Sequence, residues 1–201
     1  MYRNCLQGFV FAMEYSVPIL QLRSETGILI LSYKRIKAMT YKQLKEEIRS
    51  ANLILTGLGE DLSGDLEAFY ERLADLLKGK DYYIITLQDK AGLTKAGLLP
   101  ERITAPCQED EPADSWDRYM HWLGFTLNQK LCVLELGVGF ARPELIRFPF
   151  EKTCYFNRKS RLVRIHEKFP QLPVGSLGRG ISIKKNPVGF FIEDSPGEEE
   201  A

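Results

Sequence analysis

The stretch from Leu131 to Phe150 constrains the fold of this chain more than any other. Its first six residues are apolar except Glu135, and they run directly into a turn that contains Gly137 and Gly139. A short apolar run that ends in glycines is typical of a buried strand in an α/β sheet, where ligands are usually held at that end of the strand. Glycine there permits a positive φ and lets a ligand approach without meeting a Cβ atom. An ordinary tight turn is the alternative, because a Gly-x-Gly pair alone has little specificity.

Further apolar runs alternate with helical patterns along the chain. Each run is apolar almost throughout, as is typical of strands buried on both faces of a parallel sheet. We therefore predict an α/β fold with a Rossmann-like parallel sheet and helices on both of its faces. The predicted strands cover residues 27–33, 52–56, 82–87, 102–104, 131–136, 161–166 and 180–183. The predicted helices cover residues 41–51, 66–77, 114–129, a short segment that closes at 95–98 and one turn at 144–147.

A helix start divides the sequence near Met39. Thr40 and Gln43 have the spacing of a capping box, whereas the preceding residues mix aromatic and apolar types without a sustained period. One hypothesis is that Met39 is the biological start and that the preceding segment comes from a mis-called start codon. The alternative is a real N-terminal arm that docks on the domain. The predicted parts are an extension at 1–38, the domain at 39–193 and an acidic tail at 194–201.

One predicted helix carries a long apolar stripe. We predict that this stripe packs in the core rather than forming a cofactor site, because any helix that covers a sheet needs such a face. His121 projects off the stripe and has no partner spaced for metal binding or nucleophilic work, so we assign it no role. The stripe on the helix predicted at 114–129 consists of Trp116, Tyr119, Met120, Leu123 and Leu127.

Composition excludes several classes of protein. Lysine plus arginine balance aspartate plus glutamate at 27 each, so no global field draws in nucleic acid or an acidic membrane. No apolar run approaches the length that spans a bilayer, and the N-terminus lacks the pattern of a secretory signal. We therefore predict a cytoplasmic protein with reduced thiols and neither nucleic-acid nor membrane partners. The four cysteines, Cys5, Cys107, Cys132 and Cys154, form no Cys-x-x-Cys pair, so no metal site is expected.

A second glycine turn follows the strand predicted at 52–56. It contains Gly57 and Gly59 and leads into a helix, an arrangement that directs free backbone N–H groups at a phosphate. The third glycine of a dinucleotide-binding turn is missing. Glu60 and Asp61 also lie in the turn, where they would repel a pyrophosphate unless they point outward or bind a ribose hydroxyl instead.

Several motifs follow one another in an order that resembles the sirtuins. These are NAD-dependent protein deacylases and ADP-ribosyltransferases with a Rossmann-type fold. The chain is most similar to the bacterial branch associated with macrodomains and lipoylated carrier proteins, and the resemblance covers residues 40–193. The motifs are the turn within Asn52–Ser63, then Ile84–Asp89, Lys95–Gly97, Arg102-Ile103, Leu134–Phe140 with Pro143, Ile146 and Phe148–Phe150, and finally Arg164–His166.

The resemblance implies an NAD site and two candidate catalytic positions. Asp89 matches the family aspartate of the nicotinamide pocket, and Gln108 falls near the position of the catalytic residue. The small zinc-binding domain of the family is expected to be absent, because the chain has no four-cysteine module. The residues implied in NAD binding are Gly57, Gly59, Ser63, Thr86, Gly137, Val138, Gly139 and His166.

Departures from the sirtuin pattern fall on the catalytic half of the site. Sirtuin deacylation needs a general base, usually histidine, but the equivalent position here is Cys107 or Gln108. Leu87 stands where the family has an asparagine, and residues 63–69, after the turn with Gly57 and Gly59, lack the arginine that the family carries in its cofactor loop. The sequence therefore favours a degenerate sirtuin-like protein that binds NAD or ADP-ribose with little or no deacylase activity.

Two other functions stay open from the sequence. One is an NAD-dependent ADP-ribosyltransferase that modifies a partner such as a lipoylated carrier protein or a macrodomain protein, since positioning and electrostatic support can cleave the glycosidic bond without a strong base. The other is a non-catalytic interaction subunit that has lost the ligand.

Overall fold

The computed structural model describes residues 39–173 and 178–193. The predictions for residues 1–38 and 194–201 lie outside the described residues. The described part of the chain contains no helix that combines the length and the apolar character needed to cross a membrane.

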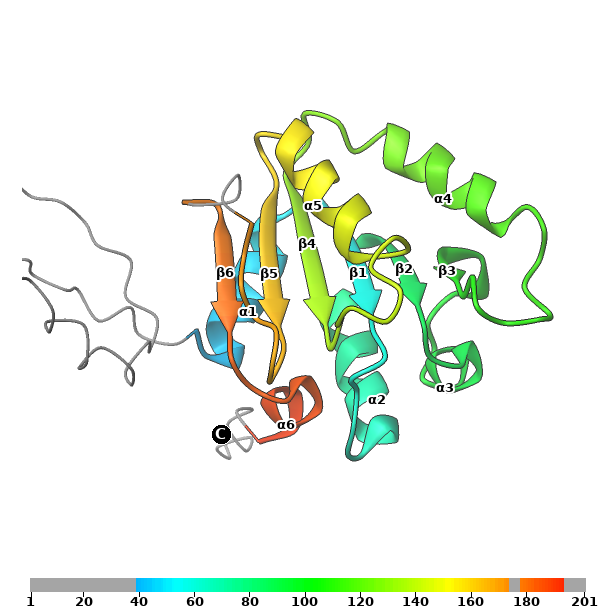
Figure 1. Cartoon of the computed structure of the whole chain (residues 1–201), viewed down its shortest axis with the longest axis horizontal. Coiled ribbons are helices and arrows are strands. Elements are labelled where there is room, and N and C mark those ends of the chain that lie inside the picture. The colour runs from blue at the N-terminus through cyan, green and yellow to red at the C-terminus, as the bar shows by residue number, and fades with distance from the viewer. Residues whose placement is uncertain (1–38, 174–177, 194–201) are drawn as a thin grey trace, which may run out of the picture. The chain divides into compact units, whose positions relative to one another are not determined.

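The described strands form one parallel sheet in the order β3-β2-β1-β4-β5-β6 (Figure 1). This is the order of a doubly wound Rossmann sheet, in which the chain reverses direction across the sheet between β1 and β4. The predicted α/β architecture is therefore confirmed. The strands are β1 (Leu53–Leu58), β2 (Asp81–Thr86), β3 (Ile103–Thr104), β4 (Leu131–Leu136), β5 (Arg161–Ile165) and β6 (Gly180–Ile183).

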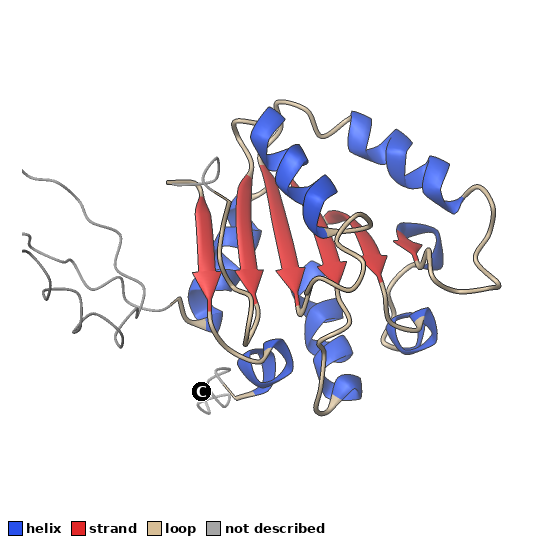
Figure 2. Cartoon of the chain, in the orientation of Figure 1, coloured by secondary structure: helices blue, strands red, loops and turns tan. Residues whose placement is uncertain are grey.

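Helices cover both faces of the sheet, as predicted (Figure 2). One face is covered by α1, α2 and α6, and the other by α4 and α5, with a separate apolar core on each side. The helices are α1 (Tyr41–Ser50), α2 (Leu66–Leu77), α3 (Lys90–Lys95), α4 (Ser115–Gly124), α5 (Arg147–Phe156) and α6 (Pro187–Ile192), with a 3₁₀ turn η1 at Pro100–Arg102.

The start of α1 follows directly from its sequence. The backbone N–H of Gln43 donates to Oγ1 of Thr40 at 3.3 Å, and the backbone N–H of Thr40 donates to Oε1 of Gln43 at 2.9 Å. These two bonds satisfy open donors at the helix start and confirm the predicted capping box. The apolar residues spaced along α1 and its C-cap, Tyr41, Leu44, Ile48 and Ala51, are buried.

The last described helix, α6, was not predicted from the sequence. Asn186 caps it, because the Asn186 side-chain oxygen accepts from the N–H groups of Val188 and Gly189. The ring of Phe191 lies 5.0 Å from that of Phe69 on α2 and 5.3 Å from that of Tyr41 on α1. A helix of only six residues shows little periodicity, so its packing rather than its pattern identifies it.

The prediction for the apolar stripe of α4 was wrong in part. The helix ends at Gly124, five residues earlier than predicted, and its inward face carries Tyr119 and Trp122. Met120 and Leu127 are 50% and 57% exposed. Turns follow Gly124, so Leu127 leaves the helical face on which the sequence pattern placed it.

The single turn predicted at 144–147 was also wrong. The helix there, α5, begins at Arg147 and runs to Phe156. Pro149 falls in its first turn, where the missing N–H of proline would have had no partner within the helix. The sequence Phe-Pro-Phe therefore opens this helix instead of ending one.

Candidate functional site

The two predicted glycine turns meet where the order of the sheet reverses. The N–H of Gly59, after β1, donates to the carbonyl of Leu136 at 2.9 Å. The N–H of Asp61 donates to the carbonyl of Gly137 at 3.0 Å, and the N–H of Gly137 donates to the carbonyl of Ile165 at 3.0 Å. Backbone hydrogen bonds thus join the carboxyl ends of β1, β4 and β5, which is the place where open α/β sheets usually hold ligands.

Close backbone packing accounts for the glycines at this junction. A Cβ atom on Gly59 would lie 2.1 Å from the carbonyl oxygen of Gly137. Gly137 has a φ of +64°, and a Cβ atom there would lie 2.9 Å from the carbonyl oxygen of Asp61. Gly57 lies deeper in the sheet, where a Cβ atom would meet Ile146 at 2.4 Å. The space left by these missing side chains is taken by neighbouring parts of the protein.

Glu60 turns its carboxylate into the loop after β4. Oε1 accepts from the N–H of Ala141 at 2.8 Å, and Oε2 accepts from the N–H of Gly139 at 3.3 Å. A Cβ atom on Gly139 would lie 2.6 Å from Glu60 Oε1, so glycine leaves the room that this carboxylate needs. The glycine loop therefore holds an anion, and the anion belongs to the protein itself.

His166, at the end of β5, is buried as a neutral imidazole. Its Nδ1 accepts from the N–H groups of Lys168 at 3.0 Å and Phe169 at 3.1 Å, which places the proton on Nε2. Nε2 lies 3.1 Å from Asp61 Oδ2, in a contact whose geometry falls short of a hydrogen bond. Burial lowers the pKa of His166, and Arg147 adds to this effect, although the Asp61 carboxylate opposes it.

Arg147 binds backbone carbonyls in the loops after β4 and β5. Its Nη2 donates to the carbonyl of Val138 at 2.9 Å and to that of Phe169 at 2.8 Å, and its guanidinium lies 4.3 Å from the ring centre of Phe140. Its Nε is buried without a hydrogen-bond partner. Burial lowers the pKa of Arg147. Val138 itself contributes a buried side chain and this one carbonyl.

A buried ion pair joins the two strands that lead into this region. Arg164 on β5 donates to both carboxylate oxygens of Glu135 on β4, at 2.6 and 3.2 Å, and also to Glu151 on α5 at 2.6 Å. Burial raises the pKa of Glu135 against the attraction of Arg164. Burial also disfavours the charge on Arg164, but the Glu135 and Glu151 carboxylates outweigh this effect and raise the pKa of Arg164. The one charged residue in the apolar strand thus has an internal partner.

The candidate catalytic residues lie in the loops after β2 and β3. Asp89 caps α3, because its Oδ1 accepts from the N–H of Ala91 at 2.9 Å. The same oxygen accepts from Nε2 of Gln108 at 2.9 Å, and these two hydrogen bonds lower the pKa of Asp89. Asp89 is exposed and Gln108 is half-buried. The structure therefore brings the two candidates together as a carboxylate and an amide donor.

A glutamine links the end of β2 to the turn that contains Gly57 and Gly59. Oγ1 of Thr86 accepts from the N–H of Gln88 at 2.9 Å, and Nε2 of Gln88 donates to the carbonyl of Gly59 at 2.8 Å. Ser63 lies apart, where Nδ2 of Asn186 donates to its hydroxyl at 2.9 Å. The predicted residues therefore fall into a group at the β1–β4 junction, a group at the end of β2, and two separate positions, Gly57 and Ser63.

Sequence reasoning missed the contributions of Arg147, Phe169 and Glu151. Glu135 gave one usable signal of a buried ion pair, since a charged side chain in a buried strand requires a partner of opposite charge. Arg147 gave none, because it falls in a segment for which the sequence predicted only a single turn. The sequence also could not predict that the Glu60 carboxylate points into the loop after β4. Its partners are the backbone N–H groups of Gly139 and Ala141, which lie far along the chain.

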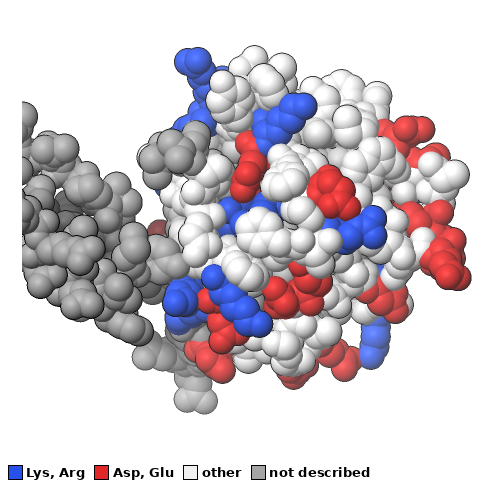
Figure 3. All heavy atoms as spheres, viewed as in Figure 1, with Lys and Arg blue, Asp and Glu red and all other residues white. Residues whose placement is uncertain are grey.

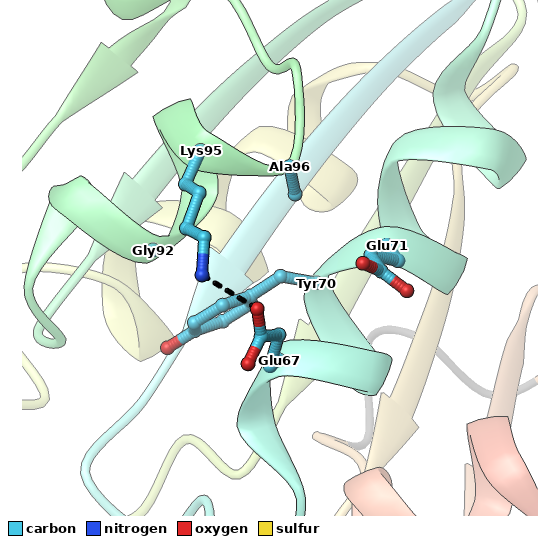
Figure 4. A pocket seen from close by; sticks show the side chains of 6 residues that line it. All are labelled: Glu67, Tyr70, Glu71, Gly92, Lys95 and Ala96. Carbon is cyan, nitrogen blue, oxygen red and sulfur yellow. Dashed lines mark hydrogen bonds and ion pairs between the residues drawn. The ribbon is translucent and has the colours of Figure 1, made fainter.

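The described residues also form hollows outside this region. One, of about 270 Å³, lies between α2 and α3 and is bridged by Lys95 and Glu67 at 2.6 Å (Figure 4). The residues of this hollow are Glu67, Tyr70, Glu71, Gly92, Lys95 and Ala96. Another hollow, of about 480 Å³, lies at the amino ends of β4 and β5, where Lys130, Lys159 and Arg161 contribute to its lining.

The surface charges are mixed. On the face drawn in Figure 3, acidic and basic side chains are interspersed.

The fold and this junction define an α/β protein of Rossmann-like architecture. Comparison with known proteins adds no family to that description. No family model matches the chain, and no curated protein is significantly similar to it.

Proposed function

We propose that this chain is a sirtuin-like nucleotide-binding protein with little or no deacylase activity. In this proposal it acts in the cytoplasm and binds NAD or ADP-ribose at the β1–β4 junction. The resemblance of its ordered motifs to the bacterial macrodomain-linked sirtuins supplies the identity of the ligand.

The observation that carries the proposal is the anion held by the loop after β4. The N–H groups of Gly139 and Ala141 converge on one carboxylate at the point where the sheet order reverses. Backbone N–H groups that converge in this way form anion-binding sites in many nucleotide-binding proteins. The position and the donors are therefore those that a nucleotide phosphate would use.

The proposed lack of deacylase activity rests on the end of β2. A general base must accept a proton at the operating pH. The Gln108 amide has no such capacity, and its nitrogen donates to Asp89. Leu87 supplies no polar group where the resemblance calls for an asparagine in the nicotinamide pocket.

Thermal unfolding of the full chain in increasing NAD or ADP-ribose tests this proposal. A ligand that binds only the folded state stabilises it by about 2.7 kcal/mol at a concentration one hundred times its Kd, so the Tm should rise with ligand concentration. Nicotinamide release with an acyl-lysine peptide should stay at background. The absence of a Tm shift at millimolar ligand would overturn the proposal.

A matched pair of variants localises the binding. Gly139→Val fills the space beside the two N–H donors and should abolish the Tm shift. Gly124→Val adds the same side chain at the end of α4, where a Cβ atom meets nothing within 4 Å, and should leave the shift unchanged. Equal responses of the two variants would place the ligand elsewhere.

A non-catalytic interaction subunit is the second candidate. It is favoured by the same carboxylate, because Glu60 occupies the donors that a phosphate would need. A protein that responds to neither NAD nor ADP-ribose would agree with this candidate.

A further inference from the structure

The carboxylate of Glu60 is held in a way that permits its exchange. It reaches from the loop after β1 to backbone donors about eighty residues further along the chain, so no local turn fixes it. Within the described residues, Glu60 takes part in no ion pair. Its carboxylate is therefore bound by two neutral donors, which hold a carboxylate less strongly than a cation would.

A second negative charge lies beside this carboxylate. Oδ2 of Asp61 would lie 3.0 Å from a Cβ atom on Gly139, and Oε1 of Glu60 would lie 2.6 Å from the same atom. Both carboxylates therefore border the space beside Gly139, and neighbouring like charges repel one another. The negative charge of Asp61 thus disfavours the bound position of the Glu60 carboxylate, which lowers the free energy needed to displace that carboxylate.

Two buried donors lie near the loop. Nε of Arg147, a residue that is 3% exposed, has no hydrogen-bond partner, and Nε2 of His166, a residue that is 1% exposed, faces only the carboxylate of Asp61 at 3.1 Å. Buried donors without partners are uncommon in folded proteins and often mark a place for a missing ligand group. Both belong to side chains that contact the loops after β4 and β5.

We propose that Glu60 is an internal competitor for a phosphate group. In the free protein its carboxylate occupies the N–H donors of Gly139 and Ala141, and a phosphate or pyrophosphate takes its place when ligand binds. Glu60 then turns toward solvent, and Arg147 offsets part of the added negative charge. Only the identification of the nucleotide rests on the proposed function; the exchange of anions does not.

Pyrophosphate binding to the full chain and to Glu60→Ala tests the proposal. The variant frees both donors, so inorganic pyrophosphate should bind it at least about tenfold more tightly than the unchanged protein, which corresponds to ~1.4 kcal/mol. The measurements are titration calorimetry and the Tm shift at matched pyrophosphate concentrations. Glu144→Ala is the control, because it also removes one carboxylate, from the loop after β4, where Glu144 pairs with Arg142 at 2.7 Å and does not contact the two donors.

The control should bind pyrophosphate as the unchanged protein does. Equal binding to all three proteins would overturn the proposal, and so would equal gains in Glu60→Ala and Glu144→Ala. If Glu60→Ala fails to fold, Glu60→Gln provides the same test, since it removes the charge and keeps an oxygen acceptor for the two donors. A gain in pyrophosphate affinity with Glu60→Gln over the unchanged protein supports the proposal, and no gain overturns it.

Parallel titrations with NAD separate this inference from the proposed function. If NAD stabilises the unchanged protein while pyrophosphate binds Glu60→Ala no better, the proposed function stands and the competitor role falls. If pyrophosphate gains affinity in Glu60→Ala while NAD binds neither protein, the competitor role stands and the nucleotide assignment falls.

Discussion

Single glycines at the β1–β4 junction fix how closely its loops approach one another. Gly59 leaves room for the carbonyl of Gly137, whereas Gly139 leaves room for the carboxylate of Glu60. The first neighbour is rigid backbone and the second is the end of a flexible side chain. The two glycines should therefore differ sharply in the substitutions that they tolerate.

Gly59→Ala should be strongly destabilising. Its Cβ atom would lie 2.1 Å from a backbone oxygen, and overpacking of this kind costs roughly 1–3 kcal/mol or more in the free energy of unfolding. Gly124→Ala is the matched control, since it meets nothing within 4 Å and gains up to about 1 kcal/mol of helix propensity. Urea denaturation measures both. A Gly59→Ala protein as stable as the unchanged chain would contradict the close approach of the two loops.

His166 should make stability depend on pH in mildly acidic solution. Its folded-state pKa lies below the ordinary value of 6.5, so the unfolded chain takes up a proton at a pH where the folded chain does not. The stability that neutral His166 contributes is present above about pH 6.5 and is lost as the pH falls through the folded-state pKa.

The variant His166→Asn should therefore lose less stability on acidification than the unchanged protein. The two slopes should differ by up to about 1.4 kcal/mol per pH unit, the value for one proton. Urea denaturation at pH values between about 7 and 5 measures them. His121→Asn, on the exposed side of α4, controls for the loss of one histidine from the unfolded chain. Identical slopes for the His166 variant and the unchanged protein would show that His166 is protonated equally in both states.

At the scale of elements, a buried ion pair couples β4, β5 and α5. Arg164→Met would leave Glu135 buried without its partner, and breaking a buried pair costs roughly 3–5 kcal/mol. Adding Glu135→Leu should restore much of that loss, because the uncompensated charge is then removed. A double-mutant cycle of unfolding free energies measures the coupling. Strict additivity of the two changes would argue against the pair, and Arg142→Met, in an exposed pair, should change little.

The sequence predicted regular elements well and their junctions less well. The helix at Leu66–Leu77 has the predicted bounds, because an apolar periodicity of helical type spans it. The helix α4 was predicted too long, because apolar residues continue at helical spacing into the turns after Gly124. Periodicity alone cannot distinguish a helix from turns that carry the same spacing. The helix α5 was underestimated because only a single turn at 144–147 was predicted, whereas the helix begins at Arg147 and continues through Pro149, which a first-turn position tolerates.

At the scale of the whole molecule, the sheet order predicts a gradient of local stability. Each of β1 and β4 is paired on both sides, whereas β3 and β6 are the edges of the described sheet. Amides of β1 and β4 should exchange with solvent only through global unfolding, and those of β6 should exchange faster through local opening. Hydrogen–deuterium exchange measures this difference. Equal protection of β6 and β4 would contradict the gradient.

The sequence could predict the architecture and the glycine turns at the ends of two strands, but not the contacts between these turns. Apolar strands that alternate with helices dictate a parallel sheet covered on both faces, and glycines at the strand ends mark the carboxyl edge. The contact of Glu60 with Gly139 joins residues far apart in the chain, and its donor is a backbone group that any residue but proline provides. No pattern of residue types can therefore indicate it.

The packing of α6 has a consequence for synthesis of the protein on the ribosome. Tyr41 and Phe69 emerge early from the exit tunnel, whereas Phe191, which covers both of them, emerges almost last among the described residues. The nascent chain must therefore carry uncovered aromatic side chains for most of its translation, and exposed apolar surface of this kind promotes aggregation. Chaperones that bind nascent chains should accordingly protect this protein until α6 has emerged.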